Sequence, residues 1–467
     1  MNNIKTSCFA GKDSDFLLVF AQSSKKKLNF ALTKTLNMLT NEEIQEISAL
    51  LRQQVVPAIG CTEPMAVALA VARATELLNE TLVSADRVVP DCIELHLSAN
   101  ILKNAMGVGI PGTGGMIGLP IAIALGAIGG KSCLGLEVLR DCTDVHLAAA
   151  KRYIDEDHIH IALEENDPDK LFIHVCVEAQ GKQAEACIKG SHTHFVDETA
   201  SSCAQAEACG EEEAVSLTLH KVYEYATTMP LTDLDFILEA KRLNEAAAEE
   251  GLRENYGHQL GKTMCSPLGR GIMGDSIFSK VLSVTSCACD ARMAGAKIPV
   301  MSNSGSGNQG ICATMPVVVF ARENHNTEEE LIRALTLSHL TAIYIKQSLG
   351  TLSALCGCVV ASTGSSVGIT YLMGGSYDQI SYSVKNMIAN LTGMICDGAK
   401  PSCALKLTTG VSTAVMSAML AIQNKNVTSA EGIIDDDVDR SIHNLTAIGS
   451  RGMDETDRFV LDIMTHK

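Results

Sequence analysis

Three cysteines in the last third of the chain have the residue type needed for metal chemistry. Cys396 and Cys403 bracket the segment CDGAKPSC, and Cys356 lies upstream in LCGC. Four cysteines saturate an iron–sulfur cluster for electron transfer, whereas three can hold a four-iron cluster and leave one iron open as a Lewis acid. The spacing is not that of a zinc knuckle, so the pattern alone leaves open a shared metal site or three separately packed thiols.

A second candidate group is the motif GCTEP, which contains Cys61 and Glu63. It lies just before an Ala/Val-rich run, 65–74, that is typical of a helix. A helix N-terminus carries partial positive charge and free N–H groups, which favour a thiolate, so Cys61 is a candidate base or nucleophile. The alternative is that Thr62 caps the helix and Cys61 packs in the core.

Two glycine-rich turns could bind an anion. The run 302–310 reads SNSGSGNQG, and the run 111–115 reads PGTGG. Neither has the sequence of a P-loop or a dinucleotide-binding turn. Glycine lets backbone N–H groups approach a small carboxylate, and Ser and Asn add donors, although a plain flexible loop stays an alternative. The candidate substrate-binding residues are Ser302, Asn303, Ser304, Asn308 and Thr113.

Two further polar residues are weaker candidates. His192 follows a predicted strand and could face a substrate, but the pattern favours a partly buried structural histidine. Lys400 lies between Cys396 and Cys403, but no phosphate-binding cup for a pyridoxal cofactor is recognisable near it.

Hydrophobic periodicity indicates the elements that must position these groups. A capping pattern at 40–43 starts a helix that ends near Pro57, and helical periodicity dominates after residue 231. Between about 86 and 196, helices are expected at 121–127 and 136–154 and strands at 92–97, 158–163, 171–179 and 184–189, the last two as a hairpin.

The expected fold class is α+β: a mainly helical catalytic domain with a smaller α+β module containing an antiparallel sheet. The helical, cluster-binding domain takes residues 39–80 and 226–467, and the module takes 81–225. Residues 1–38 are expected to be an appendage, either disordered or not native.

Composition excludes several classes of protein. The chain has 37 Lys plus Arg and 54 Asp plus Glu, a net charge of −17, which disfavours binding to nucleic acid or an anionic membrane. Its 17 cysteines, without a convincing secretory leader, favour a reducing cytoplasm. Most of them, such as Cys92, Cys176 and Cys312, are expected to be core residues.

Two long uncharged stretches, 104–130 and 347–377, are the basis for a membrane-transporter alternative. Both contain many Gly, Ser, Thr or Asn residues, and the chain has no Trp for the interfacial belts of a membrane protein. Buried helices of a soluble protein are the better interpretation.

Several motifs in the same order resemble the iron–sulfur L-cysteine desulfidases, which are related to the α chain of iron–sulfur L-serine dehydratases. The resemblance runs from about Leu39 to the C-terminus. It is carried by PAIGCTEP from Pro57, PGTG from Pro111, DARM from Asp290, the run 301–310, LSALC ending at Cys356, and GMICDGA from Gly393.

The resemblance implies that Cys356, Cys396 and Cys403 hold a [4Fe-4S] cluster and that Cys61 accepts a proton, with Glu63 beside it as a catalytic residue. Cys358 is outside the family pattern. The implied reaction is a non-redox β-elimination of L-cysteine to sulfide, ammonia and pyruvate by an oxygen-sensitive, cytoplasmic carbon–sulfur lyase.

Alternatives to this activity are an L-serine dehydratase that uses the same cluster and, from other classes, a transporter or a non-catalytic iron–sulfur sensor. The expected partner is a small amino acid substrate, with no nucleic acid and no membrane, and the chain could form a homodimer.

Overall fold

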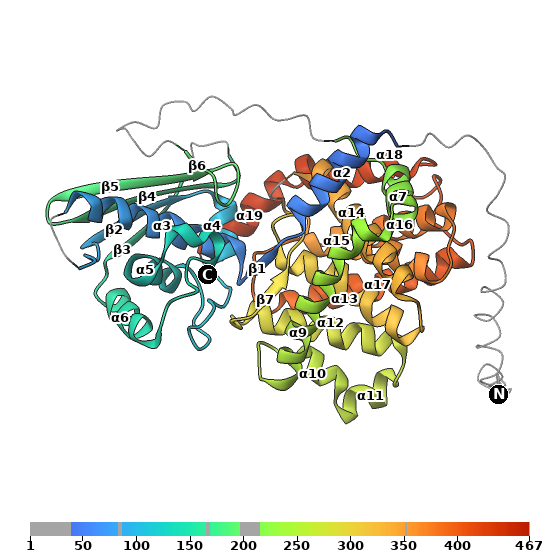
Figure 1. Cartoon of the computed structure of the whole chain (residues 1–467), viewed down its shortest axis with the longest axis horizontal. Helices are drawn as coiled ribbons and strands as arrows, with labels where there is room; N and C mark the ends of the chain where they lie inside the picture. Colours follow the sequence, from blue (N-terminus) through green and yellow to red (C-terminus); the bar gives the residue numbers. More distant parts are fainter. Residues whose placement is uncertain (1–38, 83–85, 165–168, 197–214, 351–352, 467) are drawn as a thin grey trace, which may run out of the picture.

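The chain folds into two bodies (Figure 1), and each has its own hydrophobic core. The computed structural model describes residues 39–82, 86–164, 169–196, 215–350 and 353–466, so the predicted appendage, 1–38, lies outside the described residues. We call the larger core, formed by helices, the helical core, and the smaller one, formed by a sheet and its covering helices, the sheet core.

The helical core is built mainly from helices of the C-terminal half. The capping box of Thr40 and Glu43 starts its first helix, as the sequence predicts. Its helices are α2 (Asn41–Gln54), α7 (Leu219–Thr228), α8 (Leu231–Leu234), α9 (Leu238–Arg253), α10 (Leu260–Cys265), α11 (Pro267–Met273), α12 (Ile277–Met293), α13 (Gly307–Glu323), α14 (Glu328–Leu349), α15 (Gly357–Leu372), α16 (Tyr377–Leu391), α17 (Cys403–Ile422) and α18 (Val438–Ala447). Short 3₁₀ and π turns at Asp235–Ile237 and Ile448–Gly452 join some of them.

The sheet core contains a five-stranded sheet in the order β3-β2-β4-β5-β6. Its strands are β2 (Cys92–Leu97), β3 (Ile159–Leu163), β4 (Phe172–Ala179), β5 (Lys182–Lys189) and β6 (Phe195–Val196), and its helices are α3 (Thr62–Thr81), α4 (Ala99–Ala105), α5 (Leu119–Gly129) and α6 (Asp144–Asp155), with a 3₁₀ turn at Ser132–Glu137. The predicted hairpin of β4 and β5 is present; Gln180 and Gly181 have φ of 53° and 72°, as a tight hairpin turn requires.

The mainly helical α+β fold class is confirmed, and one detail of the sheet is different. The sequence predicts an antiparallel sheet. In the structure β2 pairs antiparallel with β4 but parallel with β3, so the sheet is mixed. The chain between β2 and β3 passes through α4, α5 and α6, and such a helical crossover is what a parallel pair requires.

The prediction that Cys92 and Cys176 are core residues is wrong. Both side chains are half-buried, because they alternate with inward-facing neighbours such as Ile93, Val175 and Val177. Cys312, in α13, is fully buried as predicted.

The two cores divide the chain at slightly different points from the predicted domain boundaries. Helix α3 supplies Met65 and Leu78 to the sheet core and packs against β4 and β5. Helix α7 packs in the helical core through Leu219 and Val222. The predicted boundaries, at residues 80 and 226, place α3 in the helical domain and most of α7 in the module. Packing instead places α3 with the sheet core and α7 with the helical core. The domain boundaries stay predictions.

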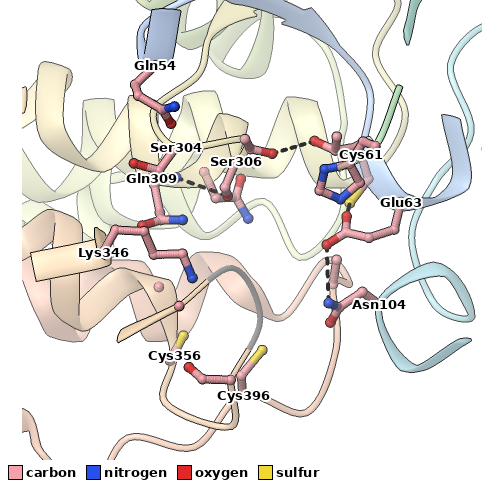
Figure 2. Close-up of a pocket in the computed structure, with 18 of the residues that line it drawn as sticks. Gln54, Cys61, Glu63, Asn104, Ser304, Ser306, Gln309, Lys346, Cys356 and Cys396 are labelled. Carbon is pink, nitrogen blue, oxygen red and sulfur yellow. Dashed lines mark hydrogen bonds between the residues drawn. The ribbon is translucent and has the colours of Figure 1, made fainter. Parts of the chain in front are cut away.

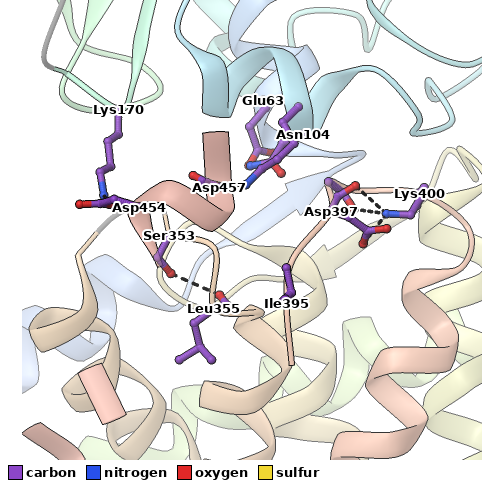
Figure 3. Close-up of polar contacts among 12 residues, drawn as sticks. Glu63, Asn104, Lys170, Ser353, Leu355, Ile395, Asp397, Lys400, Asp454 and Asp457 are labelled. Atoms are coloured by element: carbon purple, nitrogen blue, oxygen red, sulfur yellow. Dashed lines mark hydrogen bonds and ion pairs between the residues drawn. The ribbon is translucent and has the colours of Figure 1, made fainter. Parts of the chain in front are cut away.

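Several contacts join the two bodies, among them a strand pairing and two ion pairs. β1 (Pro57–Ile59), which precedes α3, pairs antiparallel with β7 (Pro299–Met301), which precedes α13. The C-terminal helix α19 (Asp454–Thr465) lies beside α4, where Asp457 pairs with the buried Lys103, and Asp454 pairs with Lys170 at 3.0 Å (Figures 1 and 3).

The described parts of the two uncharged stretches include the ends of α4 and α14 and two complete helices. They contain α5, of 11 residues, and α15, of 16 residues, both less than the roughly 20 residues of a membrane span. Among the described residues one helix, α17, is long and apolar enough to cross a membrane; half of that segment is buried, and a core helix of a soluble protein meets the same criteria.

Glycine at position 364 allows α15 to cross α14 closely. A Cβ there would lie 2.2 Å from the Ser338 carbonyl oxygen, so we expect Gly364→Ala to destabilise the protein by about 1–3 kcal/mol and lower its urea midpoint. Gly271→Ala, in α11, is the control: its Cβ would meet nothing within 4 Å, and the change should be neutral or slightly stabilising. Equal midpoints for the two variants would contradict this account of the crossing.

Candidate active site

A cavity of about 560 Å³ lies where the two bodies meet (Figure 2). The sheet-core body supplies Glu63, Asn104 and His192 to its wall. The helical body supplies the polar residues Gln54, Arg292, Ser304, Ser306, Asn308, Gln309 and Lys346, and the thiols Cys356, Cys358, Cys396 and Cys403. Cys61 lies at the junction, and all three predicted cluster cysteines therefore share one cavity with the predicted base.

The pairing of β1 with β7 positions Cys61 beside the 302–310 loop. Ser304 donates its backbone N–H to Gln54, and the Thr62 hydroxyl donates to the Gly305 carbonyl at 2.7 Å. Gly60 makes the turn before Cys61 with φ of 73°, where a Cβ would lie 2.6 Å from Pro111. Cys61 is thereby fixed as the N-cap of α3.

Cys61, Glu63 and Asn104 form a hydrogen-bonded chain (Figure 2). The Cys61 thiol donates to Glu63 Oε2 at 3.1 Å, and Asn104 Nδ2 donates to Glu63 Oε1 at 3.1 Å. Burial, and then the negative charge of Glu63, raise the pKa of Cys61 well above its usual value, and Arg292 offsets this only in part. The helix terminus was expected to favour a thiolate at Cys61, but the loss of hydration and the Glu63 charge outweigh the helix dipole.

Arg292 is a cavity residue to which sequence reasoning assigned no role. Its side chain is only 3% exposed; Nη2 donates to the Gly60 carbonyl at 2.8 Å and Nη1 donates to Asn308 Oδ1 at 3.0 Å. Arg292 thus ties the turn before Cys61 to the start of α13. An Asp and an Arg two residues apart in an otherwise apolar run, the DARM motif, were the available signal.

The 302–310 loop brings only some of the predicted substrate-binding residues to the cavity. Ser304 and Asn308 line it. Ser302 does not, since its hydroxyl donates to the Val56 carbonyl at 2.6 Å. Asn303 is fully buried and donates to both Nδ1 and the carbonyl oxygen of His339, so it braces the loop from behind.

Thr113 also lies outside the cavity wall. Its buried hydroxyl donates to the Ile110 carbonyl at 2.7 Å and accepts from the Met116 N–H at 3.1 Å. Both of its hydrogen-bonding roles are used within its own turn. The glycine-rich run 111–115 is therefore a self-contained turn beside the Cys61 loop rather than a part of the described cavity.

The cluster candidates are brought together by a short backbone pairing. The Cys356 N–H donates to Met394 at 2.9 Å and the Cys396 N–H donates to Ala354 at 2.7 Å, so the two cysteines stand side by side on adjacent segments. Cys403 is the first residue of α17 and follows the turn that starts at Cys396. Three thiols from two stretches of the chain, around 356 and 396–403, thus line one cavity.

The three cysteines have the donor chemistry that an iron–sulfur cluster needs, since their soft thiols line one cavity. Among the described residues, no group of three His, Cys, Asp or Glu side chains is arranged to hold one metal ion. Each thiolate of a four-iron cluster binds a different iron, so its ligands need not converge on one point.

The segment that carries Cys396 and Cys403 is held by charge and by close packing. Asp397 pairs with Lys400 at 2.7 Å (Figure 3) and also with Lys406; these lysines offset its burial and lower the pKa of Asp397 to about 2. Gly398, with φ of 87°, lets the segment touch α4, where a Cβ would lie 2.2 Å from the Lys103 carbonyl.

The cavity wall contains polar atoms that have no partner. They are His192 Nε2, Gln309 Oε1 and Arg292 Nε, all buried and without a hydrogen bond in the described structure. Burial lowers the pKa of His192, which keeps its imidazole neutral. Unsatisfied buried polar groups are costly, and their concentration here is what a site for a polar ligand requires.

Comparison with known proteins identifies the family. The family described as serine dehydratase alpha chain matches residues 134–462, which is more than half of the chain. The chain belongs to the serine dehydratase alpha chain family. It is thus related to the iron–sulfur serine dehydratases, which are lyases, and the expected relationship is confirmed.

Several relatives match this chain over almost their whole length. A UPF0597 protein of Bacteroides fragilis is 63% identical over 435 residues, covering 92% of this chain and 100% of the relative. Similar proteins of Phocaeicola vulgatus and Shewanella halifaxensis are 62% and 44% identical, covering 92% and 89% of this chain and 99% and 97% of the relatives. The names of these relatives state no activity.

The Cys61–Glu63 contact predicts how Cys61 reacts with iodoacetamide. The thiolate is the reactive form, and the Glu63 carboxylate raises the thiol pKa, so Glu63→Gln should lower that pKa and speed alkylation of Cys61 near neutral pH. Mass spectrometry of the Cys61 peptide against pH measures the rate. Exposed Cys133, in the same digest, is the internal control, and an unchanged Cys61 rate relative to Cys133 would contradict the assignment.

Proposed function

We propose that this protein is an iron–sulfur L-cysteine desulfidase, a lyase that eliminates sulfide from L-cysteine without net redox change. The observation that carries the proposal is the single cavity that holds Cys61 and Glu63 together with Cys356, Cys396 and Cys403. The motifs of the sequence favour this reaction within the family to which the chain belongs.

The proposed cofactor is a [4Fe-4S] cluster held by Cys356, Cys396 and Cys403. When bound, such a cluster supplies an iron without a protein ligand, which attracts the substrate's soft sulfur and makes it a better leaving group. Sulfur is preferred by this thiophilic metal over a hydroxyl oxygen. Cys358, beside Cys356, also lines the cavity and is not proposed as a ligand.

The chain's own residues handle the proton. Cys61 is proposed to take the Cα proton of the substrate, which requires that its thiol first lose a proton. Glu63 Oε2 already accepts the hydrogen bond from that thiol, and Asn104 orients the carboxylate. Glu63 is therefore placed to receive the thiol proton as the substrate enters. The aminoacrylate that forms hydrolyses to pyruvate and ammonia.

Dehydration of L-serine is the second candidate function, and the family description favours it. The same base could remove the Cα proton of serine, with hydroxide as the leaving group in place of sulfide. Comparing kcat/KM for pyruvate formation from the two amino acids separates the candidates. The desulfidase proposal expects L-cysteine to be the better substrate, and the opposite order would overturn it in favour of the dehydratase.

A homodimer and a cytoplasmic location are proposals that go with this function. A reducing compartment would keep the cysteines as thiols, and the cavity cysteines Cys61, Cys356, Cys396 and Cys403 are free thiols. The competing idea of a non-catalytic sensor predicts cluster formation without sulfide or pyruvate release.

Substitution of a ligand and of the base should have different effects. After anaerobic reconstitution, Cys396→Ser should lower the iron and acid-labile sulfide bound per chain and abolish turnover. Cys61→Ser should keep the iron and lose at least about 100-fold in kcat, as expected for removal of a general base. Sulfide and pyruvate release from L-cysteine are the activity readouts.

Cys358→Ser is the matched control, since it removes a neighbouring cavity thiol that has no proposed role. It should keep both iron and turnover. Full turnover of the Cys396 variant would overturn the cluster assignment, and full turnover of the Cys61 variant would remove only the proposed base.

A further inference from the structure

Lys346 is a cation in the cavity wall without a partner. It lies near the C-terminal end of α14 and lines the cavity, where Figure 2 shows its side chain extending toward Cys356 and Cys396. In the part of the chain that the structure describes, its ammonium takes part in no ion pair and no hydrogen bond. Lys346 is half-buried, and an ammonium that loses part of its hydration is stabilised by a negative partner.

We propose that Lys346 binds the carboxylate of the amino acid substrate. This inference rests on the proposed function, since it needs an α-amino acid whose Cα–H faces Cys61 and whose β-substituent faces the three thiols. Lys346 lines the same cavity as Glu63, Cys356 and Cys396, and Figure 2 shows its side chain extending toward the two cysteines. A substrate held between the base and the three thiols would therefore have its carboxylate, the third substituent of the Cα atom, within the cavity that Lys346 lines.

The other charged or predicted carboxylate-binding groups are engaged, except for Arg292 Nε, which has no hydrogen bond. Arg292 is the second cation of the cavity wall, and its two terminal nitrogens donate to Gly60 and Asn308. Ser302 donates to the Val56 carbonyl and Asn303 donates to His339, so neither directs its donor into the cavity. Burial lowers the pKa of His192, so it offers no charge.

Lys346 keeps its charge under ordinary conditions. Burial lowers its pKa to about 8, while the nearby acidic groups act in the opposite direction. At pH 7 the ammonium form still predominates, and a bound carboxylate would favour it further. Ser304, Ser306 and Gln309, also on the cavity wall, could add neutral hydrogen bonds to the same carboxylate.

The test removes the positive charge of Lys346 by substitution and, separately, removes the carboxylate by changing the ligand from L-cysteine to cysteamine. In a Cys61→Ser background, which prevents turnover, calorimetry measures the Kd of L-cysteine and of cysteamine, which has the amine and thiol of L-cysteine but no carboxylate. Lys346→Gln should weaken L-cysteine about 10- to 100-fold, the loss of one charge-assisted hydrogen bond, and leave cysteamine nearly unchanged.

Two variants act as controls. Arg292→Gln removes the other cavity charge and should affect L-cysteine and cysteamine alike, since Arg292 positions the Cys61 turn. Lys346→Arg keeps a positive charge and should preserve the preference for L-cysteine over cysteamine. This second variant also keeps the test open if the glutamine variant does not fold.

Three results would overturn the proposal. Equal weakening of both ligands by Lys346→Gln would show that the lysine does not act on the carboxylate. Loss of iron in that variant would assign the lysine to the cluster instead. Selective loss of L-cysteine binding in Arg292→Gln would make Arg292 the carboxylate ligand. Absence of sulfide release from the iron-loaded parent is a different outcome, because it rejects the desulfidase function itself.

Discussion

The antiparallel pairing of β1 with β7 is the contact on which the candidate active site depends. It joins residues 57–59 to 299–301, far apart in the chain, and each strand runs directly into a cavity-lining helix terminus. The Cys61 end of α3 and the serine-rich start of α13 are thereby fixed side by side. Because α3 belongs to the sheet core and α13 to the helical core, the same pairing also holds the two bodies at the mouth of the cavity.

Local patterns were enough to predict much of the fold. The capping box at Thr40, the period-two strands and the hairpin at Gln180 each depend on residues within a few positions of one another. The parallel pairing of β3 with β2 could not be predicted in this way, because it depends on where a long helical crossover returns. The outward positions of Cys92 and Cys176 were similarly hidden, since cysteine is equally at home on either face of a half-buried strand.

In the candidate site, too, some features could be predicted from the sequence and others could not. The GCTEP motif and the three cysteines could be selected from residue type and resemblance, and all four thiols line one cavity. The direction of each donor in the 302–310 loop could not be predicted. Asn303 faces His339, a buried histidine whose pKa burial lowers to about 3, while Ser304 on the next position faces the cavity. Lys346 gave no local signal at all, because a lysine near the C-terminal end of a helix is normally solvated.

Charge explains why these groups must act together. Cys61 is buried beside the Glu63 carboxylate, which disfavours a thiolate, whereas Arg292 and Lys346 place two positive charges on the same cavity wall without a carboxylate partner of their own. An anionic substrate would offset those cations. The proton of Cys61 lies on the 3.1 Å hydrogen bond to Glu63, so the proposed transfer to the carboxylate needs no movement of either backbone. If Cys61 is the proposed base, its thiolate would form by that transfer rather than through the dipole of α3 alone, because burial and the Glu63 charge hold the thiol neutral.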